Sequence, residues 1–256
     1  MLLTIDMGNT NIVLGCLAGE RVLFTERMET NLRKTELEYA IAFRTVLEMY
    51  GISPESLEGI IISSVVPPLV PVLRQALGKL TDAHVLVVST QIDTGLTLRM
   101  DNPAAVGSDL IVDAVAAAAL YGTPVIVIDM GTATTLSVLD KQGDYVGTII
   151  LPGARISLDS LTARTAQLPK IGLTVPEKVV GKNTADCMRS GVLYGAAATL
   201  DGMIDRIWEE LGYKTQVVAT GGLSHIVVPH CTHAITCDDD LLLQGLRMIY
   251  ERNRRN

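Results

Sequence analysis

The chain contains the same short sequence pattern twice, and this repeat constrains its fold more than any other feature. The first copy, residues 2–11, is an apolar run that ends in Asp6 and continues into a turn rich in hydrogen-bonding side chains. The second copy, residues 125–135, repeats the Asp-Met-Gly step at Asp129 and again continues into a polar turn. A pattern repeated at matching places is typical of a duplicated structural unit. We therefore expect two related halves that each begin with a strand, an acid and a glycine turn.

The length and the composition allow a separate core in each half. A chain of 256 residues can form two domains of about 100–150 residues each. The composition is 48% hydrophobic and 19% charged, which is typical of a globular protein. Since no low-complexity linker separates the two patterns, we place the boundary near Gly122 and expect halves of residues 1–121 and 122–256.

Hydrophobic spacing predicts an α/β protein with a similar order of elements in both halves. Thr35 is a suitable N-cap for the first helix and Gly51 a suitable stop, while prolines at 67, 68 and 71 predict an irregular start to the second helix. In the first half we predict strands at residues 2–5, 12–14, 22–24, 60–64 and 85–88, and a helix at 35–50. In the second half we predict strands at 125–128, 136–138, 145–150 and 216–220, and helices at 157–167, 190–211 and 241–252.

Both glycine turns have the residue types that bind a phosphate chain. Phosphate oxygens need backbone N–H groups that come close and side-chain hydroxyls or amides, and a nearby carboxylate can hold Mg²⁺. The first turn offers Gly8, Asn9, Thr10 and Asn11 beside Asp6, and the second offers Gly131, Thr132, Thr134 and Thr135 beside Asp129. Such residues also make good hairpin turns. Two copies, each after a buried strand, favour phosphate binding, and the absence of a Walker lysine excludes a P-loop.

A further carboxylate stands at the start of a predicted helix after residue 107. Ser108 can cap this helix, Asp109 lies in its first turn, and Asp113 lies four residues on and so on the same face. A carboxylate at this place is suited to accept a hydroxyl proton during phosphoryl transfer. Acidic residues also favour helix N-termini for electrostatic reasons alone. From the residue pattern by itself, that simpler interpretation is the favoured one.

Four motifs together resemble those of the type III pantothenate kinases, in order and in spacing, over essentially the whole chain. They are Asp6-Met7-Gly8-Asn9-Thr10-Asn11, Gly107-Ser108-Asp109, Asp129-Met130-Gly131-Thr132-Ala133-Thr134, and Asn183-Thr184 with Ser190-Gly191. The resemblance implies an actin-like ATPase fold of two ribonuclease-H-like halves, each a mixed β-sheet with flanking helices. It also implies ATP, Mg²⁺ and a monovalent cation (K⁺ or NH₄⁺) as cofactors, pantothenate as substrate, and a homodimer.

The resemblance also implies a role for each matching residue. Asp109 would be the catalytic base on the pantothenate hydroxyl, which reverses the simpler interpretation above. Asp129 would hold the monovalent cation. The residue types of the first turn separately make Asp6 the expected Mg²⁺ ligand. The glycine pair Gly221-Gly222 matches the place where actin-like folds pass close to the nucleoside. The implied ATP-binding residues are Asp6, Met7, Gly8, Asn9, Thr10, Asn11, Ile12, Val13 and Thr132, and the implied substrate-binding residues are Met100, Gly107, Ser108, Asp109, Leu110 and Thr184.

The sequence departs from the family pattern at two positions of the substrate set. Leu110 stands where the family has an arginine that meets the substrate carboxylate, and Met100 stands where it has a tyrosine. A hydrogen bond to a charged group is worth on the order of 1.5–3 kcal/mol, so its loss must be compensated or the substrate must differ. Candidate replacement cations are Arg99, Arg155 and Arg164. The alternatives that remain are a kinase for another small hydroxylated substrate and a non-catalytic nucleotide-binding regulatory protein.

Composition excludes several other classes of function. The net charge is −7 and the chain has only two phenylalanines and one tryptophan, so we expect no nucleic-acid partner. No apolar run approaches the roughly 18 residues that a membrane span needs, and we expect neither a membrane partner nor a signal peptide. The four cysteines do not suggest a disulfide framework, so we expect a cytoplasmic protein. The histidines and cysteines of residues 225–237 lack zinc-site spacing and predict a loop.

Overall fold

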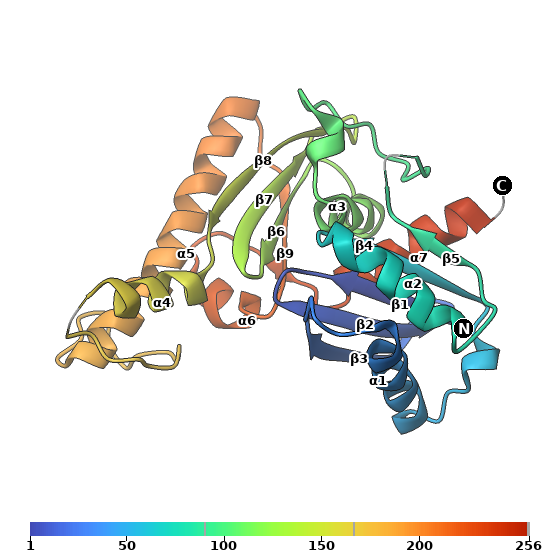
Figure 1. Cartoon of the computed structure of the whole chain (residues 1–256). Coiled ribbons are helices and arrows are strands. Elements are labelled where there is room, and N and C mark those ends of the chain that lie inside the picture. The colour runs from blue at the N-terminus through green and yellow to red at the C-terminus, as the bar shows by residue number, and fades with distance from the viewer. Residues whose placement is uncertain (90, 166, 255–256) are drawn as a thin grey trace. The chain divides into compact units, whose positions relative to one another are not determined.

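The computed structural model describes residues 1–89, 91–165 and 167–254 and contains two five-stranded sheets (Figure 1). Contacts divide the chain into two compact units. The first unit comprises Met1–Leu96, Asp101–Ala116 and the C-terminal segment that starts at Asp240, and the second comprises Thr97–Met100 and Ala117–Asp239. These units differ from halves cut after residue 121, because the last helix belongs with the first sheet. A boundary of the repeat at that position stays a prediction.

The sheet of the first unit has the order β3-β2-β1-β4-β5. Its strands are β1 (Leu2–Met7), β2 (Asn11–Ala18), β3 (Arg21–Glu29), β4 (Gly59–Ser64) and β5 (Val85–Val87). The pairs β1–β2 and β2–β3 are antiparallel, while β1–β4 and β4–β5 are parallel, so the sheet is mixed. The Gly8 turn lies between β1 and β2, at the end of the sheet where the parallel strands β1 and β4 also finish.

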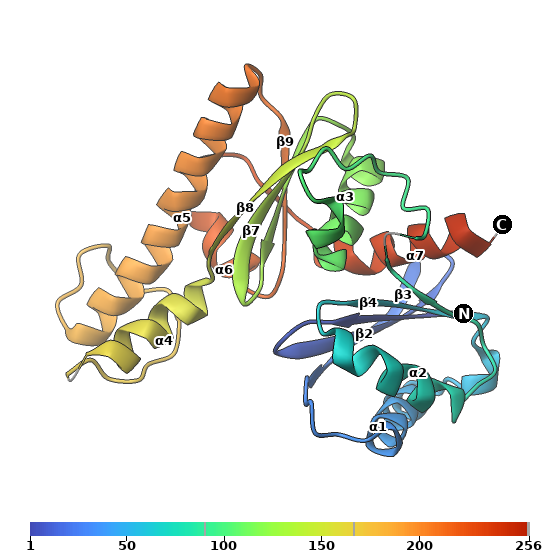
Figure 2. The same cartoon turned by 45° about the horizontal axis from the view of Figure 1, so that its top comes forward.

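Helices cover both faces of the first sheet (Figure 2). One face packs α1 (Glu36–Met49) and α2 (Val70–Gly78) against every second residue of β1, starting at Leu3, and the other packs residues of α3 (Ser108–Tyr121) and α7 (Leu241–Arg254) against Leu2. Short 3₁₀ turns at Pro54–Ser56, Pro67–Leu69 and Pro103–Ala105 complete the unit. Because side chains of a strand alternate between faces, Asp6 lies on the face of α3 and α7.

Two helix starts in the first unit follow the sequence prediction. Thr35 caps α1 through a reciprocal capping box with Glu38, and the carboxylate of Glu38 accepts from the Thr35 backbone N–H at 2.8 Å. Gly51 follows the helix with φ of 65°, a conformation that glycine adopts without strain. The prolines before α2 give a 3₁₀ turn and not a regular first turn, as expected.

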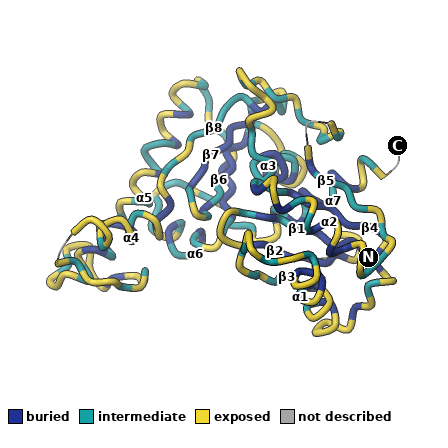
Figure 3. The backbone as a smooth tube through the Cα atoms, in the orientation of Figure 1, coloured by how far each residue is buried: buried dark blue, intermediate teal, exposed yellow. Residues whose placement is uncertain are grey.

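The sheet of the second unit repeats the connectivity of the first. Its order is β10-β9-β6-β7-β8, with β6–β7 and β7–β8 antiparallel and β6–β9 and β9–β10 parallel. The strands are β6 (Val125–Met130), β7 (Ala133–Leu139), β8 (Tyr145–Pro152), β9 (Gln216–Thr220) and β10 (Thr236–Cys237). Strand β6 therefore corresponds to β1, and β9 to β4. Both central strands, β1 and β6, are largely buried (Figure 3).

The helices of the second unit differ from the predicted ones mainly at their ends. They are α4 (Ala154–Arg164), α5 (Thr184–Leu211) and the short α6 (Ser224–Val227), followed by a 3₁₀ turn at Val228–His230. Helix α5 was expected from Ser190, but it begins at Thr184 because the Asn183 side chain accepts a hydrogen bond from the backbone N–H of Asp186. Helix α4 begins at Ala154, before the predicted Ser157, and ends at Arg164. The predicted continuation to residue 167 includes residue 166, which lies outside the described residues. No helix in the described part of the chain is long and apolar enough to cross a membrane.

Candidate functional site

The first glycine turn is held rigidly at its backbone while its side chains stay exposed. The Gly8 N–H donates to the Asn11 carbonyl at 2.9 Å. Thr30, directly after β3, braces the turn from the side, because its hydroxyl donates to the Gly8 carbonyl at 2.7 Å and its N–H donates to the Thr10 carbonyl at 2.9 Å. The side chains of Asn9, Thr10 and Asn11 are exposed. The turn thus combines a fixed backbone with accessible amide and hydroxyl groups.

Asp6 is next to the end of the parallel strand β4. In the parallel register Asp6 pairs with Ser63, and neighbouring strands of a sheet lie about 5 Å apart with paired residues on the same face. Ser63 is fully buried, whereas Asp6 is half-buried. Ligands of α/β proteins bind at the carboxyl ends of parallel strands, which is where Asp6 and Ser63 lie.

Ser108 attaches the start of α3 to this same end of β4. Its hydroxyl lies 2.9 Å from the Ser63 hydroxyl, accepts from the Ser64 N–H at 3.0 Å and lies 3.1 Å from the Ser64 carbonyl oxygen. The helix begins at Ser108, and the Gly107 carbonyl accepts the N–H of Ile111 at 3.3 Å. The expectation that Ser108 caps the helix is therefore wrong, because Gly107 occupies the cap position and Ser108 fastens the helix to the sheet.

This attachment brings Asp109 to the same face of the first sheet as Asp6. Burial raises the pKa of the Asp109 carboxyl group above its usual range, although the Leu110 N–H, which donates to Oδ1 at 2.9 Å, opposes that rise. A Cβ atom at Gly107 would lie only 2.5 Å from Oδ1, so the glycine leaves the space that this carboxylate occupies. A desolvated carboxylate with a raised pKa is a stronger proton acceptor than a fully solvated one.

In the second unit, Asp129 is the last residue but one of β6, as Asp6 is of β1. It pairs with Thr135 of β7 and with Thr220 of β9, so the three side chains share one face of the second sheet. The buried hydroxyl of Thr135 has no hydrogen-bond partner among the described residues. Gly221 passes very close to the acid: a Cβ atom there would lie 2.6 Å from Asp129 Oδ1. Carboxylate and hydroxyl oxygens are ligands that suit a hard cation, so these residues fit the expected cation site.

The second glycine turn is closed by the connection between β8 and α4. A Cβ atom at Gly153 would lie 2.2 Å from the carbonyl oxygen of Thr132 and 2.8 Å from that of Gly131. Only glycine at 153 therefore permits this approach. The Thr132 side chain is exposed, beside the first residues of α4. The turn matches the first one in place, and the corresponding segment supports each turn: Thr30 directly follows β3, and Gly153 directly follows β8.

The remaining predicted substrate residues lie in separate parts of the two units. Leu110 is half-buried in the first turn of α3, and Met100 is half-buried in the short segment that belongs to the second unit. Thr184 is exposed as the first residue of α5. Of the candidate replacement cations, Arg99 is paired with Asp144 at 2.8 Å, while Arg155 and Arg164 are exposed on α4.

Three supporting residues of the site escaped the sequence analysis. Thr30 braces the first turn, and Ser63 and Ser64 receive Ser108. A signal for the serines was present, since they follow the apolar run Ile60–Ile62 and polar residues at the end of a buried parallel strand mark a ligand edge. Thr30 had no such signal, because its contact with Gly8 depends on the register of β2 and β3.

The histidines and cysteines of residues 225–237 do not lie in a single loop as predicted, because His225 lies in α6, His230 in the 3₁₀ turn and Cys237 in β10. His225 contacts the Asp239 carboxylate at 2.8 Å, and the backbone N–H groups of Thr232 and His233 donate to Asp201. Burial raises the pKa of Cys231 to about 12, so this thiol is protonated at neutral pH. Among the described residues no group of three or more His, Cys, Asp or Glu side chains could hold a metal ion.

Solved structures with the same fold have very different sequences. A putative 2-dehydro-3-deoxygalactonokinase from Sinorhizobium meliloti superposes with a TM-score of 0.60 at 14% identity, over 98% of this chain and 96% of that one. The component A of (R)-2-hydroxyglutaryl-CoA dehydratase from Acidaminococcus fermentans gives 0.55 at 15% identity, over 96% and 94%. Together with the two sheets of matching connectivity, these likenesses confirm the expected fold of duplicated ribonuclease-H-like halves.

Sequence comparison identifies the family. The family model for type III pantothenate kinase matches residues 2–206. A type III pantothenate kinase of Moorella thermoacetica is 42% identical over 253 residues, which cover 99% of this chain and 100% of that protein. One from Exiguobacterium sp. is 43% identical over 255 residues, with both chains covered completely. A family match across most of the chain and full-length relatives at this identity show that the chain belongs to the type III pantothenate kinase family.

Proposed function

We propose that this protein transfers the γ-phosphoryl group of ATP to the primary hydroxyl of pantothenate. The product is 4′-phosphopantothenate, and the reaction is the first step of coenzyme A synthesis. Membership of the family supports the reaction. The observation that carries it is local: Ser108 fastens the helix turn that bears Asp109 to the strand end beside Asp6. Phosphoryl transfer needs both a phosphate-binding turn and a base at one edge.

Asp109 acts as the base in this proposal. It accepts a hydrogen bond from the pantothenate hydroxyl and takes its proton as the oxygen attacks the phosphorus atom. The pKa raised by burial makes the carboxylate a better proton acceptor. Gly107 keeps the space that the carboxylate occupies. The hydroxyl of Ser108 is already used in holding the helix, so its substrate contact would come from the backbone.

The glycine turns bind the phosphates. The residues from Asp6 to Val13 would contact the triphosphate through backbone N–H groups and the exposed side chains of Asn9, Thr10 and Asn11, and Thr132 would contribute a hydroxyl. Met7 and Ile12 are buried and hold the hairpin in the core. Asp6 would hold Mg²⁺, which neutralises phosphate charge when it is bound.

Asp129 would hold the monovalent cation. The hydroxyl of Thr135 is an oxygen without a partner in the described structure, and it shares a sheet face with the Asp129 carboxylate, so both oxygen types are available to a cation. A bound K⁺ or NH₄⁺ supplies positive charge that a P-loop enzyme obtains from lysine. Turnover in K⁺ should then exceed turnover in Na⁺ at equal ionic strength. Equal rates in the two buffers would remove the cation from the proposal.

The substrate contacts are the part of the proposed site that departs from the family pattern. Met100, Gly107, Leu110 and Thr184 would contact pantothenate. Since Leu110 cannot pair with the pantothenate carboxylate, Arg155 or Arg164 of α4 would supply the positive charge; Arg99 is already paired with Asp144. We also propose a cytoplasmic homodimer, as the family resemblance implies.

A coupled assay that detects ADP tests the proposal directly. ADP should form only when ATP, Mg²⁺, K⁺ and pantothenate are all present, and mass spectrometry should show a phosphorylated product. If another hydroxylated acid or alcohol from a panel gives turnover and pantothenate does not, the enzyme is a kinase of different specificity. Tight ATP binding with no transfer to any acceptor would instead identify a nucleotide-binding regulatory protein.

A further inference from the structure

A polar hollow adjoins the first glycine turn within the first unit. Its volume is about 380 Å³, and one wall is Asn9 at the tip of the turn. The segment that follows β3 also lines the hollow, with Thr30, Asn31 and Arg33, and so does Val66, two residues after β4. Asn9 is a proposed phosphate contact, but none of the functions assigned above uses Arg33.

Hydrogen bonds fix the segment after β3 to the same framework as the turn. Thr30 binds the carbonyls of Gly8 and Thr10, as described above. Asn31 is held by the buried Tyr39, whose hydroxyl donates to the Asn31 carbonyl at 2.9 Å and lies 3.1 Å from its N–H. The Asn31 side chain in turn accepts from the Arg33 N–H at 2.9 Å. The backbone of Arg33 is therefore positioned relative to Asn9 by a chain of short contacts.

The guanidinium of Arg33 is an available positive charge. The side chain is exposed, and none of the ion pairs among the described residues involves it. Arg44 on α1 of the same unit, by contrast, is paired with Glu48 at 3.1 Å. Arginine presents a planar fork of donors that matches phosphate oxygens in pairs. An arginine outside these ion pairs and beside a phosphate-binding turn is therefore suited to donate hydrogen bonds to phosphate oxygens.

We propose that Arg33 contacts the phosphate chain of the nucleotide held by the Gly8 turn. The proposal rests on the proposed function only in that the turn binds phosphates. The proposal supplies a positive charge to the negatively charged phosphates. The turn offers amides and hydroxyls but no cationic side chain, and the chain has no Walker lysine. The Arg33 guanidinium closes over the hollow when the nucleotide arrives, so that ATP and ADP are held from the turn and from the segment after β3.

Two features of the hollow bear on this choice of ligand. Glu29 also lines it and repels an anion, so its removal should strengthen nucleotide binding. Val66, which also lines the hollow, follows Val65 in the sequence, and the Val65 side chain lies 3.7 Å from the Cβ position of Gly107. The carboxylate of the acceptor is the competing occupant. The continuity of the hollow with Asn9 favours the phosphates, and the experiment separates the two.

The test measures dissociation constants of ATP, ADP and adenosine for the full-length protein by calorimetry. Arg33→Gln should weaken ATP and ADP by about ten- to a hundredfold, the range for a lost charge-assisted bond, and leave adenosine unchanged. Arg33→Lys should recover part of the loss, because it keeps the charge but not the fork. Arg44→Gln changes the net charge equally and should bind all three ligands as the wild type does. Glu29→Gln should bind ATP at least as tightly as the wild type.

Two results would overturn the assignment. Equal weakening of adenosine and ATP by Arg33→Gln would show a general loss of the nucleotide site. Unchanged nucleotide binding with a raised KM for pantothenate would assign the hollow to the acceptor. Wild-type protein that binds ATP without phosphorylating pantothenate would contradict the proposed function, while the comparison of ATP with adenosine would still decide the role of Arg33.

Discussion

The two Asp-Met-Gly turns have the same hairpin but different neighbours at the end of the paired parallel strand. Beside Asp6, strand β4 ends in serines whose backbone and side chains bind Ser108 at the start of a helix. Beside Asp129, strand β9 is followed by Gly221, whose backbone passes directly against the carboxylate. The first arrangement brings in a second acidic residue, Asp109, and the second encloses the acid that is already there.

This difference separates the features that the duplication fixes from those that each half adds. The repeated sheet places an acid and a glycine turn at one end of a central strand in both units. The group that meets the end of the neighbouring parallel strand then differs: it is the start of α3 in the first unit and the Gly221 backbone in the second. On the proposed function, the first unit would supply the base and the second would supply the cation site.

Removing the proposed base should give the largest effect. Asp109→Asn should lower kcat by about 10²–10⁴, the usual contribution of general-base catalysis. The same variant should be as stable as the wild type or more stable at pH 7. The folded-state pKa of Asp109 is raised, so the unfolded chain releases this proton more readily, and the charged group costs stability once the pH exceeds its ordinary value.

The pH profile gives a second measurement on the same residue. Wild-type kcat/KM should fall as the pH drops through the raised pKa of Asp109, since the base must be ionised. Asp82→Asn, at an exposed acid of the same unit, serves as a control and should change neither kcat nor Tm. Near-normal turnover by Asp109→Asn would show that Asp109 is not the base. The proposed chemical difference between the two units would then be lost.

Two glycines allow a closer comparison of the two units, because Gly107 leaves space for the Asp109 carboxylate and Gly221 for the Asp129 carboxylate. Gly107→Ala puts a Cβ atom 2.5 Å from Asp109 Oδ1, and the end of a side chain can rotate away. We expect kcat to fall by about ten- to a hundredfold, because a displacement near 1 Å can cost that much, while Tm changes little. A loss of Tm without a loss of kcat would mean that the glycine serves folding and not the position of the base.

The matching glycine of the second unit should act on stability instead. Gly221 has φ of 90°, and an added Cβ atom would lie 2.7 Å from the backbone of Met130 as well as near Asp129. Backbone cannot move aside as a side chain can, so Gly221→Ala should cost about 1–3 kcal/mol and weaken the dependence of the rate on K⁺. Gly195→Ala on α5, where no atom lies within 4 Å, should instead stabilise by about 0.5–1 kcal/mol. Thermal unfolding of both variants measures the contrast.

Sequence patterns predicted the elements that depend on local residues, and they failed where distant contacts decide. The hairpins, the Thr35 cap and the irregular start of α2 all follow from spacing and from turn chemistry. The role of Ser108 does not follow from spacing or turn chemistry, because its partner Ser64 is 44 residues away in the sequence. The start of α5 was placed too late because its first turn is polar and only the Asn183 cap marks it. Helix α7 joins the first sheet through Leu246 and Ile249, a choice of partner that local periodicity does not contain.

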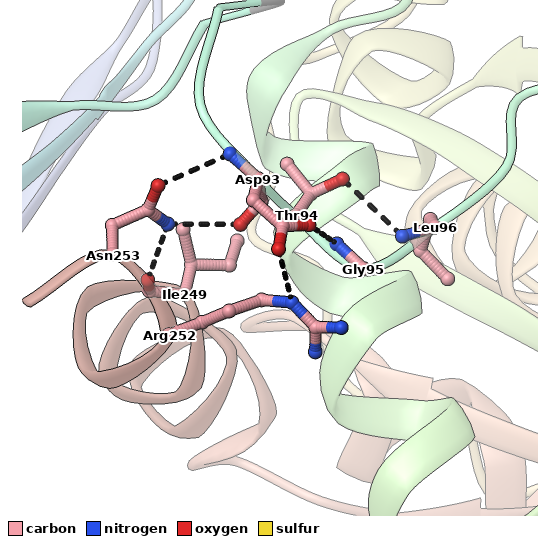
Figure 4. Close-up of polar contacts among 7 residues, drawn as sticks. All are labelled: Asp93, Thr94, Gly95, Leu96, Ile249, Arg252 and Asn253. Atoms are coloured by element: carbon pink, nitrogen blue, oxygen red, sulfur yellow. Dashed lines mark hydrogen bonds and ion pairs between the residues drawn. The ribbon is translucent and has the colours of Figure 1, made fainter. Parts of the chain in front are cut away.

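The two halves also differ in how their last strand reaches their last helix. Strand β10 ends at Cys237 and α7 begins at Leu241, whereas β5 ends at Val87 and α3 begins only at Ser108. The longer connection contains Met100, one of the proposed substrate residues, and it is tied down near its start by α7 (Figure 4). The extra length therefore carries a proposed substrate residue, and contacts with α7 hold the connection at Asp93.

The tether combines one ion pair with several backbone contacts. Arg252 Nε donates to the Asp93 carboxylate at 2.8 Å, and the Asn253 amide donates to the Asp93 carbonyl at 2.8 Å (Figure 4). The ion pair and the Gly95 N–H hold the pKa of Asp93 below its usual range. The contribution of this carboxylate to stability is therefore present above the ordinary pKa of aspartate and is lost as the pH falls through the lowered value.

Cutting the ion pair should give the smallest effect of the series. Asp93→Asn leaves the two hydrogen bonds between its backbone and Asn253 in place, and exposed ion pairs are screened by salt. We expect a slight fall in Tm at low ionic strength that disappears at high salt, together with a raised KM for pantothenate and an unchanged kcat. Asn253→Ala, which removes the backbone contacts instead, should raise KM further, because those contacts position the connection itself. If both variants keep the wild-type KM, the connection reaches the site without its tether, and its length alone distinguishes the first half from the second.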